Sequence, residues 1–331
     1  MALTNAQYDK IMRRYDEVRE RHRHELLEKE KRIFSEIPEM KALQDKVSEV
    51  SVAEARRRIL QGKKVSEDYA GKMHFLKERK KQLLLSHGYP ANALELTYDC
   101  PICKDTGLVD GHRCSCFLHM AAQVLYEESE LPAILEEENF SHFSFDWYSD
   151  TIMDGSSGKS QRELAEYAVW YAKNFARGVG TSGDNLYIYG KTGVGKTFLT
   201  HCIAKDAIDH SASVVCATAG GLFQTLTNTR FHPDAEGLSY ERLVLRTDLL
   251  VIDDLGTEYL TGPGLEELFR VLNERITGRK STVISTNLSI EALSRRYDER
   301  ITSRILDRYK VLKLDANDIR ISRQLSKGGQ S

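Results

Sequence analysis

The chain has 331 residues, 47 basic and 49 acidic side chains, and a formal net charge of −2. This length suits about two domains, and the balanced charge excludes binding of nucleic acid through overall charge, so any such binding is local. No apolar stretch approaches the roughly 20 residues that span a bilayer, and the first residues are too polar for a secretory signal. We therefore expect a cytoplasmic protein with no membrane partner and with reduced cysteines.

The first 95 residues are predicted to form a helical region. They are rich in Lys, Arg and Glu, and residues 1–88 hold one proline, Pro38. Apolar residues recur at helical spacing, which predicts two or three amphipathic helices with breaks near residues 35–38 and 61–62. The pattern fits a solvated charged surface and a helical hairpin that docks on a partner equally well.

A cysteine-rich loop follows, within residues 96–125. Two pairs of cysteines have the spacings C-x2-C and C-x-C and are separated by ten residues. Because Zn²⁺ takes four tetrahedral ligands, two short knuckles on a hairpin containing Gly107 and Gly111 suit it. The tight second pair leaves open that His112 or His119 replaces one cysteine. We predict a structural zinc site with the ligands Cys100, Cys103, Cys114 and Cys116.

Strand-like and helix-like runs alternate through a third region, residues 137–331. Such alternation predicts an α/β fold, in which a parallel sheet has helices on both faces. The predicted strands cover residues 186–189, 213–217, 249–253 and 282–286. The predicted helices cover residues 163–177, 221–228 and 264–277.

A glycine-rich loop directly follows the first of these strands. Residues 190–197 read G-K-T-G-V-G-K-T, with the G-x4-G-K-T spacing of the P-loop. Its glycines permit a tight turn that directs backbone N–H groups toward a phosphate, Lys196 adds a positive charge, and the Thr197 hydroxyl can hold Mg²⁺. We predict that ATP or ADP is bound by Gly190, Lys191, Thr192, Gly193, Val194, Gly195, Lys196, Thr197 and Phe198.

Polar side chains lie at the carboxyl ends of two later predicted strands, 249–253 and 282–286. Asp253 and Asp254 follow the apolar run Leu-Leu-Val-Ile, and Asn287 follows Thr286. Ligands of such sheets bind at the carboxyl ends of strands, so Asp253 is placed to orient Mg²⁺. Asp254 is placed to polarise the attacking water, and Asn287 to position it near the γ-phosphate.

Arginines cluster near the end of the chain. Arg300, Arg304 and Arg308 are spaced by four and so share one helical face. An exposed arginine there can stabilise phosphoryl-transfer charge in a neighbouring subunit's site. Arg320 is placed to reach the nucleotide phosphates from a small lid.

Together these motifs resemble those of the AAA+ ATPases. The order is GKTGVGKT, LLVIDD, STN, an arginine-bearing helix and a late arginine. More narrowly, LLVIDDLGTEYL, VISTNLS and HFSFDWY are similar to segments of bacterial replicative helicase loaders of the DnaC/DnaI type and of their IstB-like relatives. The cysteine-rich loop is similar to the zinc module of Gram-positive loaders.

The resemblance implies further roles. Lys196 and Thr197 match the Walker A pair, Asp253 the Walker B carboxylate, Asn287 sensor 1 and Arg320 sensor 2. Arg304 matches the arginine finger, with Arg300 as the other candidate. Asp254 stands where many AAA+ proteins carry glutamate, which implies slow hydrolysis.

The family also implies partners. The N-terminal helices would hold the replicative helicase hexamer, and copies of the chain would assemble when ATP binds. The segment 220–246, with Arg230, Arg242 and Arg246, would lie near single-stranded DNA. Three alternatives remain open: an ATPase that assists a transposase, a P-loop kinase acting on a small molecule, and a binding module with a vestigial P-loop.

Overall fold

The computed structural model describes residues 3–61, 67–231, 240–258 and 262–328. The chain divides into two compact units, one of residues 12–106 and one of residues 1–11 with 107–331. The predicted regions 1–95, 96–125 and 137–331 are bounded differently, and they stay predictions. No helix within the described ranges combines the length and the apolar composition needed to cross a bilayer.

The unit of residues 12–106 is built from helices, as predicted. Helix α1 (Asn5–Glu36) is followed by α2 (Pro38–Gln61) and α3 (Glu67–Ser86). The break between α1 and α2 falls in the predicted interval because Pro38, which lacks a backbone N–H, suits the first turn of a helix. A small core joins the end of α1, the start of α2 and the end of α3, and consists of Ile33, Ile37, Met40, Leu83 and Leu84.

The larger unit begins, after the first turns of α1, with a small hairpin of β1 (Leu108–Val109) and β2 (His112–Arg113). Its turn residues Asp110 and Gly111 both have positive φ, the conformation that two-residue hairpin turns require. The hairpin leads into α4 (Ser115–Glu127), α5 (Leu131–Glu137) and the 3-10 turn η1 (Phe145–Trp147).

Five parallel strands form the central sheet. They are β3 (Asn185–Tyr189), β4 (Val214–Thr218), β5 (Leu249–Leu255), β6 (Ser281–Thr286) and β7 (Lys310–Lys313). The order is β4-β5-β6-β3-β7, and all four neighbouring pairs are parallel. One strand, β6, therefore lies between the P-loop strand β3 and the acidic strand β5.

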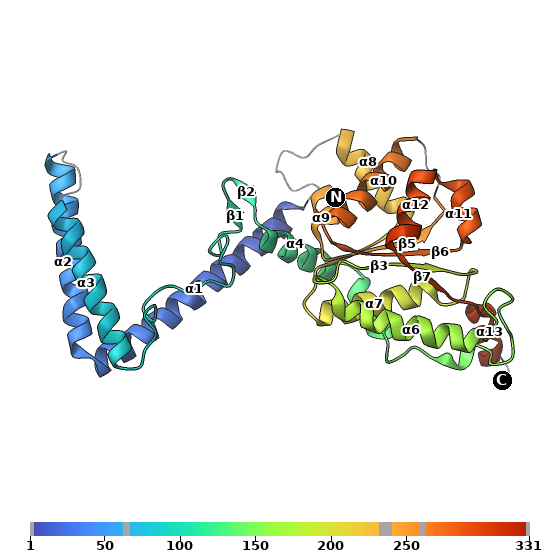
Figure 1. The fold of residues 1–331 in the computed structure, drawn as a ribbon, viewed down its shortest axis with the longest axis horizontal. Helices are drawn as coiled ribbons and strands as arrows, with labels where there is room; N and C mark the ends of the chain where they lie inside the picture. The colour runs from blue at the N-terminus through green and yellow to red at the C-terminus, as the bar shows by residue number, and fades with distance from the viewer. Residues whose placement is uncertain (1–2, 62–66, 232–239, 259–261, 329–331) are drawn as a thin grey trace. The chain divides into compact units, whose positions relative to one another are not determined.

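Helices cover both faces of the sheet, so the predicted α/β architecture is confirmed (Figure 1). On one face lie α6 (Gln161–Gly178) and α7 (Lys196–Asp209). On the other lie α8 (Ala219–Phe231), α9 (Tyr240–Arg246), α10 (Gly262–Thr277), α11 (Ile290–Arg296) and α12 (Glu299–Arg308). The last helix is α13 (Ile319–Gly328).

Local chemistry explains where these elements begin. Helix α6 begins with a capping box, in which the Ser160 hydroxyl accepts from the Glu163 N–H and the Glu163 carboxylate accepts from the Ser160 N–H. Strand β3 is almost fully buried because helices cover both faces of the sheet. Helix α9 and strand β7 were not predicted from the sequence.

Candidate nucleotide site

The P-loop connects the carboxyl end of β3 to the amino end of α7. Gly195, the residue before α7, has a φ of 92°, and Gly193 has a φ of 83°, both in the left-handed region. This path places successive N–H groups at a helix N-terminus, where a phosphate is favoured. The loop therefore has the geometry that its sequence predicts.

The loop glycines are also required by close neighbours. A Cβ atom on Gly190 would lie 2.0 Å from the Leu314 carbonyl oxygen, and one on Gly193 would lie 2.3 Å from the carboxyl carbon of Asp318. Residue 318 immediately precedes α13, whose Ile319 N–H donates to the Gly193 carbonyl at 2.9 Å. The start of α13 therefore packs directly on the P-loop.

Lys196 is held inside the loop. Its ammonium group donates to the Lys191 carbonyl at 2.9 Å, and the residue is 6% exposed. Burial lowers the pKa of Lys196, while the negative charges of Asp254 and Asp253 oppose that shift and the positive charge of Arg320 adds to it. The charges of both carboxylates and of Arg320 therefore act on this lysine.

The Asp253 carboxylate contacts the helix that follows the P-loop. The Thr197 hydroxyl donates to Asp253 at 2.9 Å, and the Ser285 hydroxyl on β6 donates to the other oxygen of the same carboxylate. Hydroxyl and carboxylate oxygens are the ligands that Mg²⁺ prefers. Thr197 and Asp253 therefore fit a magnesium ion held beside the phosphates. Ser285 was not predicted, although the run S-T-N places its hydroxyl at the end of a strand.

Asp254 lies on a β-bulge. The pairing of β5 with β6 shifts register between Ile252 and Leu255, and Asp254 has a φ of 55°. Its N–H donates to the Ser285 hydroxyl at 3.0 Å, and its side chain is exposed. A bulge redirects side chains at the end of a strand, so Asp254 points to solvent instead of into the next layer.

The remaining predicted residues lie at several places. Asn287 is exposed directly after β6. On α12, Arg300 and Arg304 lie 5.0 and 5.9 Å from the centre of the Phe269 ring of α10, and Arg300 also pairs with Asp298 at 2.9 Å. Both arginines thus share one surface, and the structure gives no reason to prefer either as the finger.

An aromatic cavity of about 420 Å³ borders the P-loop. The buried Tyr148 hydroxyl donates to the Val194 carbonyl at 2.9 Å, and burial raises the pKa of Tyr148. The Tyr148 ring stacks on Phe143, with the two rings 10° from parallel. No role was predicted for these two rings, although both belong to the segment HFSFDWY. The cavity is lined by Phe143, Trp147, Tyr148, Gly195, Phe198 and Ile319, among others.

The four predicted zinc ligands are brought together. The sulfur atoms of Cys100, Cys103, Cys114 and Cys116 all lie within 4.8 Å of one another. Tetrahedral Zn²⁺ with bonds of about 2.3 Å separates its sulfurs by about 3.8 Å, so this cluster fits zinc. His119 instead lies 3.7 Å from the carboxylate of Asp248, which makes it a poor substitute ligand.

These features define a P-loop nucleotide-binding protein: a parallel sheet, a glycine cradle at a helix N-terminus and a carboxylate two strands away. Residues 174–325 match the family model described as IstB-like ATP binding protein. This part of the chain is thus similar to IstB-like ATP-binding proteins, in agreement with the resemblance of its motifs.

The curated relatives include proteins of three kinds. The replicative helicase loader DnaI of Bacillus subtilis is 30% identical over 35% of this chain and 37% of its own length. An insertion sequence ATP-binding protein of Sinorhizobium fredii, y4pL, described as putative, is 33% identical over 33% and 43%. The chromosomal replication initiator DnaA of Campylobacter concisus is 30% identical over 42% and 31%. The chain thus spans less than half the length of each.

One solved structure is similar to part of this chain. The crystal structure of the DnaC helicase loader is 23% identical, with a TM-score of 0.44, and the match covers 55% of this chain and 99% of that one.

Proposed function

We propose that the protein is an ATP-dependent loader of the replicative DNA helicase onto single-stranded DNA. The observation that carries the ATP-dependent part is the Thr197–Asp253 hydrogen bond at 2.9 Å. It joins the P-loop helix to the acidic strand at the place where a triphosphate and its magnesium ion would sit. The similarity to DnaI supports the choice of helicase loading.

Each residue of the site has a role in this proposal. The P-loop amides bind the phosphates, and Lys196 leaves the Lys191 carbonyl to pair with them. Thr197 and Asp253 hold Mg²⁺, while Asp254 polarises the attacking water and Asn287 positions it. Arg320 contacts the phosphates in the same subunit.

Assembly completes the site in the proposed mechanism. Arg304 of one copy, or Arg300 beside it, stabilises charge in the site of the next copy. Because such a contact is head-to-tail, ATP would order copies side by side. The rings of the 420 Å³ cavity are suited to receive the base of the nucleotide.

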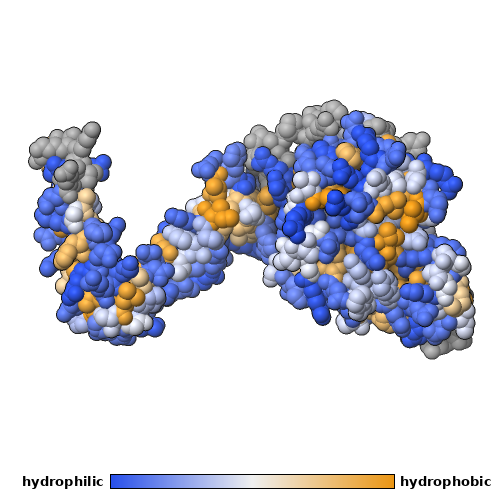
Figure 2. Space-filling model, in the orientation of Figure 1, coloured by the Kyte–Doolittle hydropathy of each residue, from blue (hydrophilic) through white to orange (hydrophobic). Residues whose placement is uncertain are grey.

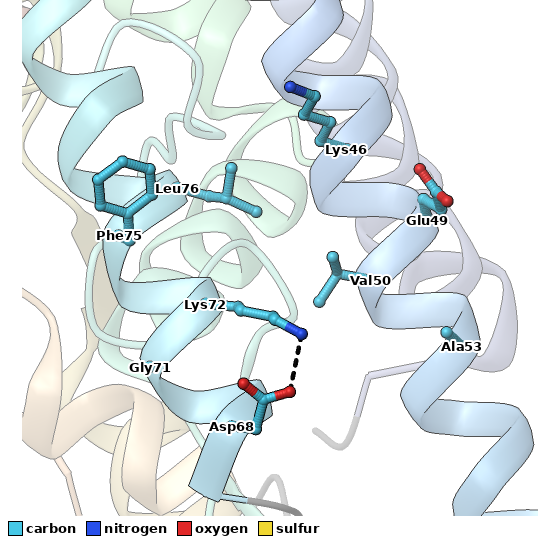
Figure 3. A pocket seen from close by; sticks show the side chains of 9 residues that line it. All are labelled: Lys46, Glu49, Val50, Ala53, Asp68, Gly71, Lys72, Phe75 and Leu76. Atoms are coloured by element: carbon cyan, nitrogen blue, oxygen red, sulfur yellow. Dashed lines mark hydrogen bonds and ion pairs between the residues drawn. The ribbon is translucent and has the colours of Figure 1, made fainter.

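The α2–α3 hairpin supports docking of a protein partner. Figure 2 shows apolar residues at the hairpin surface among hydrophilic ones, and Ile59 and Leu60 are 82% and 81% exposed. A groove of about 650 Å³ runs between the two helices, with Val50 and Leu76 facing it and the Asp68–Lys72 ion pair at its edge (Figure 3). We propose that a helix of the helicase lies in this groove.

The proposed DNA contact at residues 220–246 has partial structural support. Arg242 and Arg246 are on α9, and both are exposed. Residues 232–239 and the side chain of Arg230 lie outside the described residues.

The cluster of Cys100, Cys103, Cys114 and Cys116 has a structural role in this proposal. Bound zinc would fold the cysteine-rich loop.

Co-purification with ATP and Mg²⁺ tests the proposal. The full chain is expected to retain the replicative helicase, and Lys196→Ala is expected to lose both ATP binding and ATP-dependent retention. Arg304→Ala should bind ATP normally and turn it over more slowly. Normal ATP binding by Lys196→Ala would contradict the site, whereas normal ATP binding without helicase retention would contradict only the loader assignment.

A transposase-assisting ATPase is the second candidate. The family description and the similarity to y4pL favour this candidate. Retention of a transposase, in place of the helicase, would identify it. A small-molecule kinase would instead show turnover per subunit that does not change with protein concentration.

A further inference from the structure

An aromatic surface on α6 lies outside the nucleotide site. Trp170 is 61% exposed and Tyr167 is 38% exposed, although burial of such rings is strongly favourable. The two rings stack with their centres 6.1 Å apart and their planes 27° from parallel. Tyr171 packs edge-on against Trp170. We call Tyr167, Trp170 and Tyr171 the aromatic platform.

Lysines border the platform on two sides. Lys159, which precedes α6, lies 5.3 Å from the centre of the Tyr167 ring. Lys310, at the start of the edge strand β7, lies 5.8 Å from Tyr167 and 5.6 Å from Tyr171. Both lysines are exposed, so the platform combines flat rings with positive charges from two different elements.

The same helix face continues with basic residues. Lys173 and Arg177 are exposed on the turns after Trp170. Acidic groups nearby are Glu166, which pairs with Arg162 at 3.2 Å, and Asp184, whose charge acts on Tyr171. The positive charges on this face thus outnumber the negative ones, which favours an anionic partner over a basic or neutral one.

We propose that the aromatic platform binds single-stranded nucleic acid, with bases stacked on Trp170 and Tyr167 and backbone phosphates paired with Lys159 and Lys310. Exposed rings together with a basic border are the combination by which proteins hold single strands without reading their sequence. A duplex has its bases stacked internally and offers no free faces to the rings. This proposal and the proposed helicase loading both require that the protein contacts single-stranded nucleic acid, and they have no other premise in common.

Titration of the full chain with end-labelled oligo(dT) of about 20 nucleotides, without ATP or helicase, tests the proposal. Trp170→Ala and Tyr167→Ala are each expected to weaken binding at least about fivefold, because one stacked base is lost. Trp170→Phe keeps a stacking ring and should stay within about twofold of wild type.

Two further measurements separate stacking from nonspecific attraction. The chain has two tryptophans, so quenching of fluorescence by oligo(dT) in the wild type, but not in Trp170→Phe, would assign the quenched ring. Lys159→Gln with Lys310→Gln should reduce the slope of log affinity against log salt by about 1.4, since each lost phosphate contact removes about 0.7. Lys77→Gln with Lys81→Gln makes the same change of net charge at exposed positions of α3, in the other unit, and should leave the slope unchanged.

Two outcomes would overturn the proposal. One is wild-type affinity of Trp170→Ala for oligo(dT) with no quenching in the wild type. The other is unchanged DNA binding together with loss of self-association or of a retained protein in Trp170→Ala, which would make the platform a protein interface. Neither outcome depends on whether the P-loop binds ATP, so the proposed function is tested separately.

Discussion

At the residue scale, glycines inside and outside the P-loop differ in whether they tolerate a side chain. Gly193→Ala should lower ATP affinity at least about tenfold, because a Cβ would meet the Asp318 carboxylate and a φ of 83° strains any other residue. Isothermal calorimetry with Mg-ATP measures this loss. Gly155→Ala is the matched control, since its Cβ would meet nothing within 4 Å, and it should bind ATP as the wild type does.

Asp254 allows the proposed hydrolytic role to be tested separately from binding. Asp254→Asn should keep ATP affinity and lose most turnover, because an amide polarises water poorly. Asp254→Glu should raise basal turnover, because its longer side chain reaches further from the bulge at residues 252–255. Phosphate release under single-turnover conditions measures both variants. Equal rates of phosphate release with Asp, Asn and Glu at position 254 would show that this side chain takes no part in hydrolysis.

The residues of the site divide by how they could be recognised. Lys196, Thr197 and Asp253 were predictable because a local spacing specifies their chemistry, and the structure brings Thr197 and Asp253 into contact. Tyr148 was missed because it is 46 residues from its partner Val194, and only folding brings the two together. Ser285 was missed for the same reason: its contact with Asp253 crosses from β6 to β5.

At the element scale, Arg275 fastens α10 to the sheet. It is fully buried, and its guanidinium donates to the carbonyls of Val244, Thr247 and Ser281 and to the Thr282 hydroxyl. Burial lowers the pKa of Arg275 to about 10, which still leaves it charged at neutral pH. One side chain thereby caps the end of α9 and the start of β6.

Removal of this guanidinium should be costly. Arg275→Met should lower the free energy of unfolding by about 3 kcal/mol, because several buried acceptors lose their donor. Urea denaturation followed by circular dichroism measures the change. Arg295→Met, at an exposed position on α11, should change stability by less than about 0.5 kcal/mol. A similar small change at Arg275 would show that water replaces the guanidinium.

Strands were predicted correctly where the chain contains a continuous run of mostly apolar residues. The apolar run before Asp253 and the P-loop strand were found because their residues are buried on both faces. Strand β7 was missed because it lies at the sheet edge and holds only two apolar residues, between two lysines, over four positions. Apolar residues of α2 such as Ile59 and Leu60 are exposed, whereas an amphipathic pattern predicts that they are buried.

At the scale of the whole molecule, the proposed assembly separates two halves of each site onto two copies. Lys196 and Asp253 belong to one copy, and Arg304 would come from its neighbour. Lys196→Ala and Arg304→Ala should therefore each be nearly inactive alone, while an equal mixture should regain turnover. In a random head-to-tail assembly, about a quarter of the junctions would pair an intact P-loop with an intact arginine.

The mixture also decides between the two candidate arginines. If Arg300→Ala complements Lys196→Ala and Arg304→Ala does not, the finger is Arg300, because a residue needed within its own copy cannot be supplied by another. If neither mixture exceeds the sum of its components while both arginine variants stay inactive, each arginine acts within its own subunit. The sites would then work independently, as in a small-molecule kinase, and ATP would not order copies of this chain.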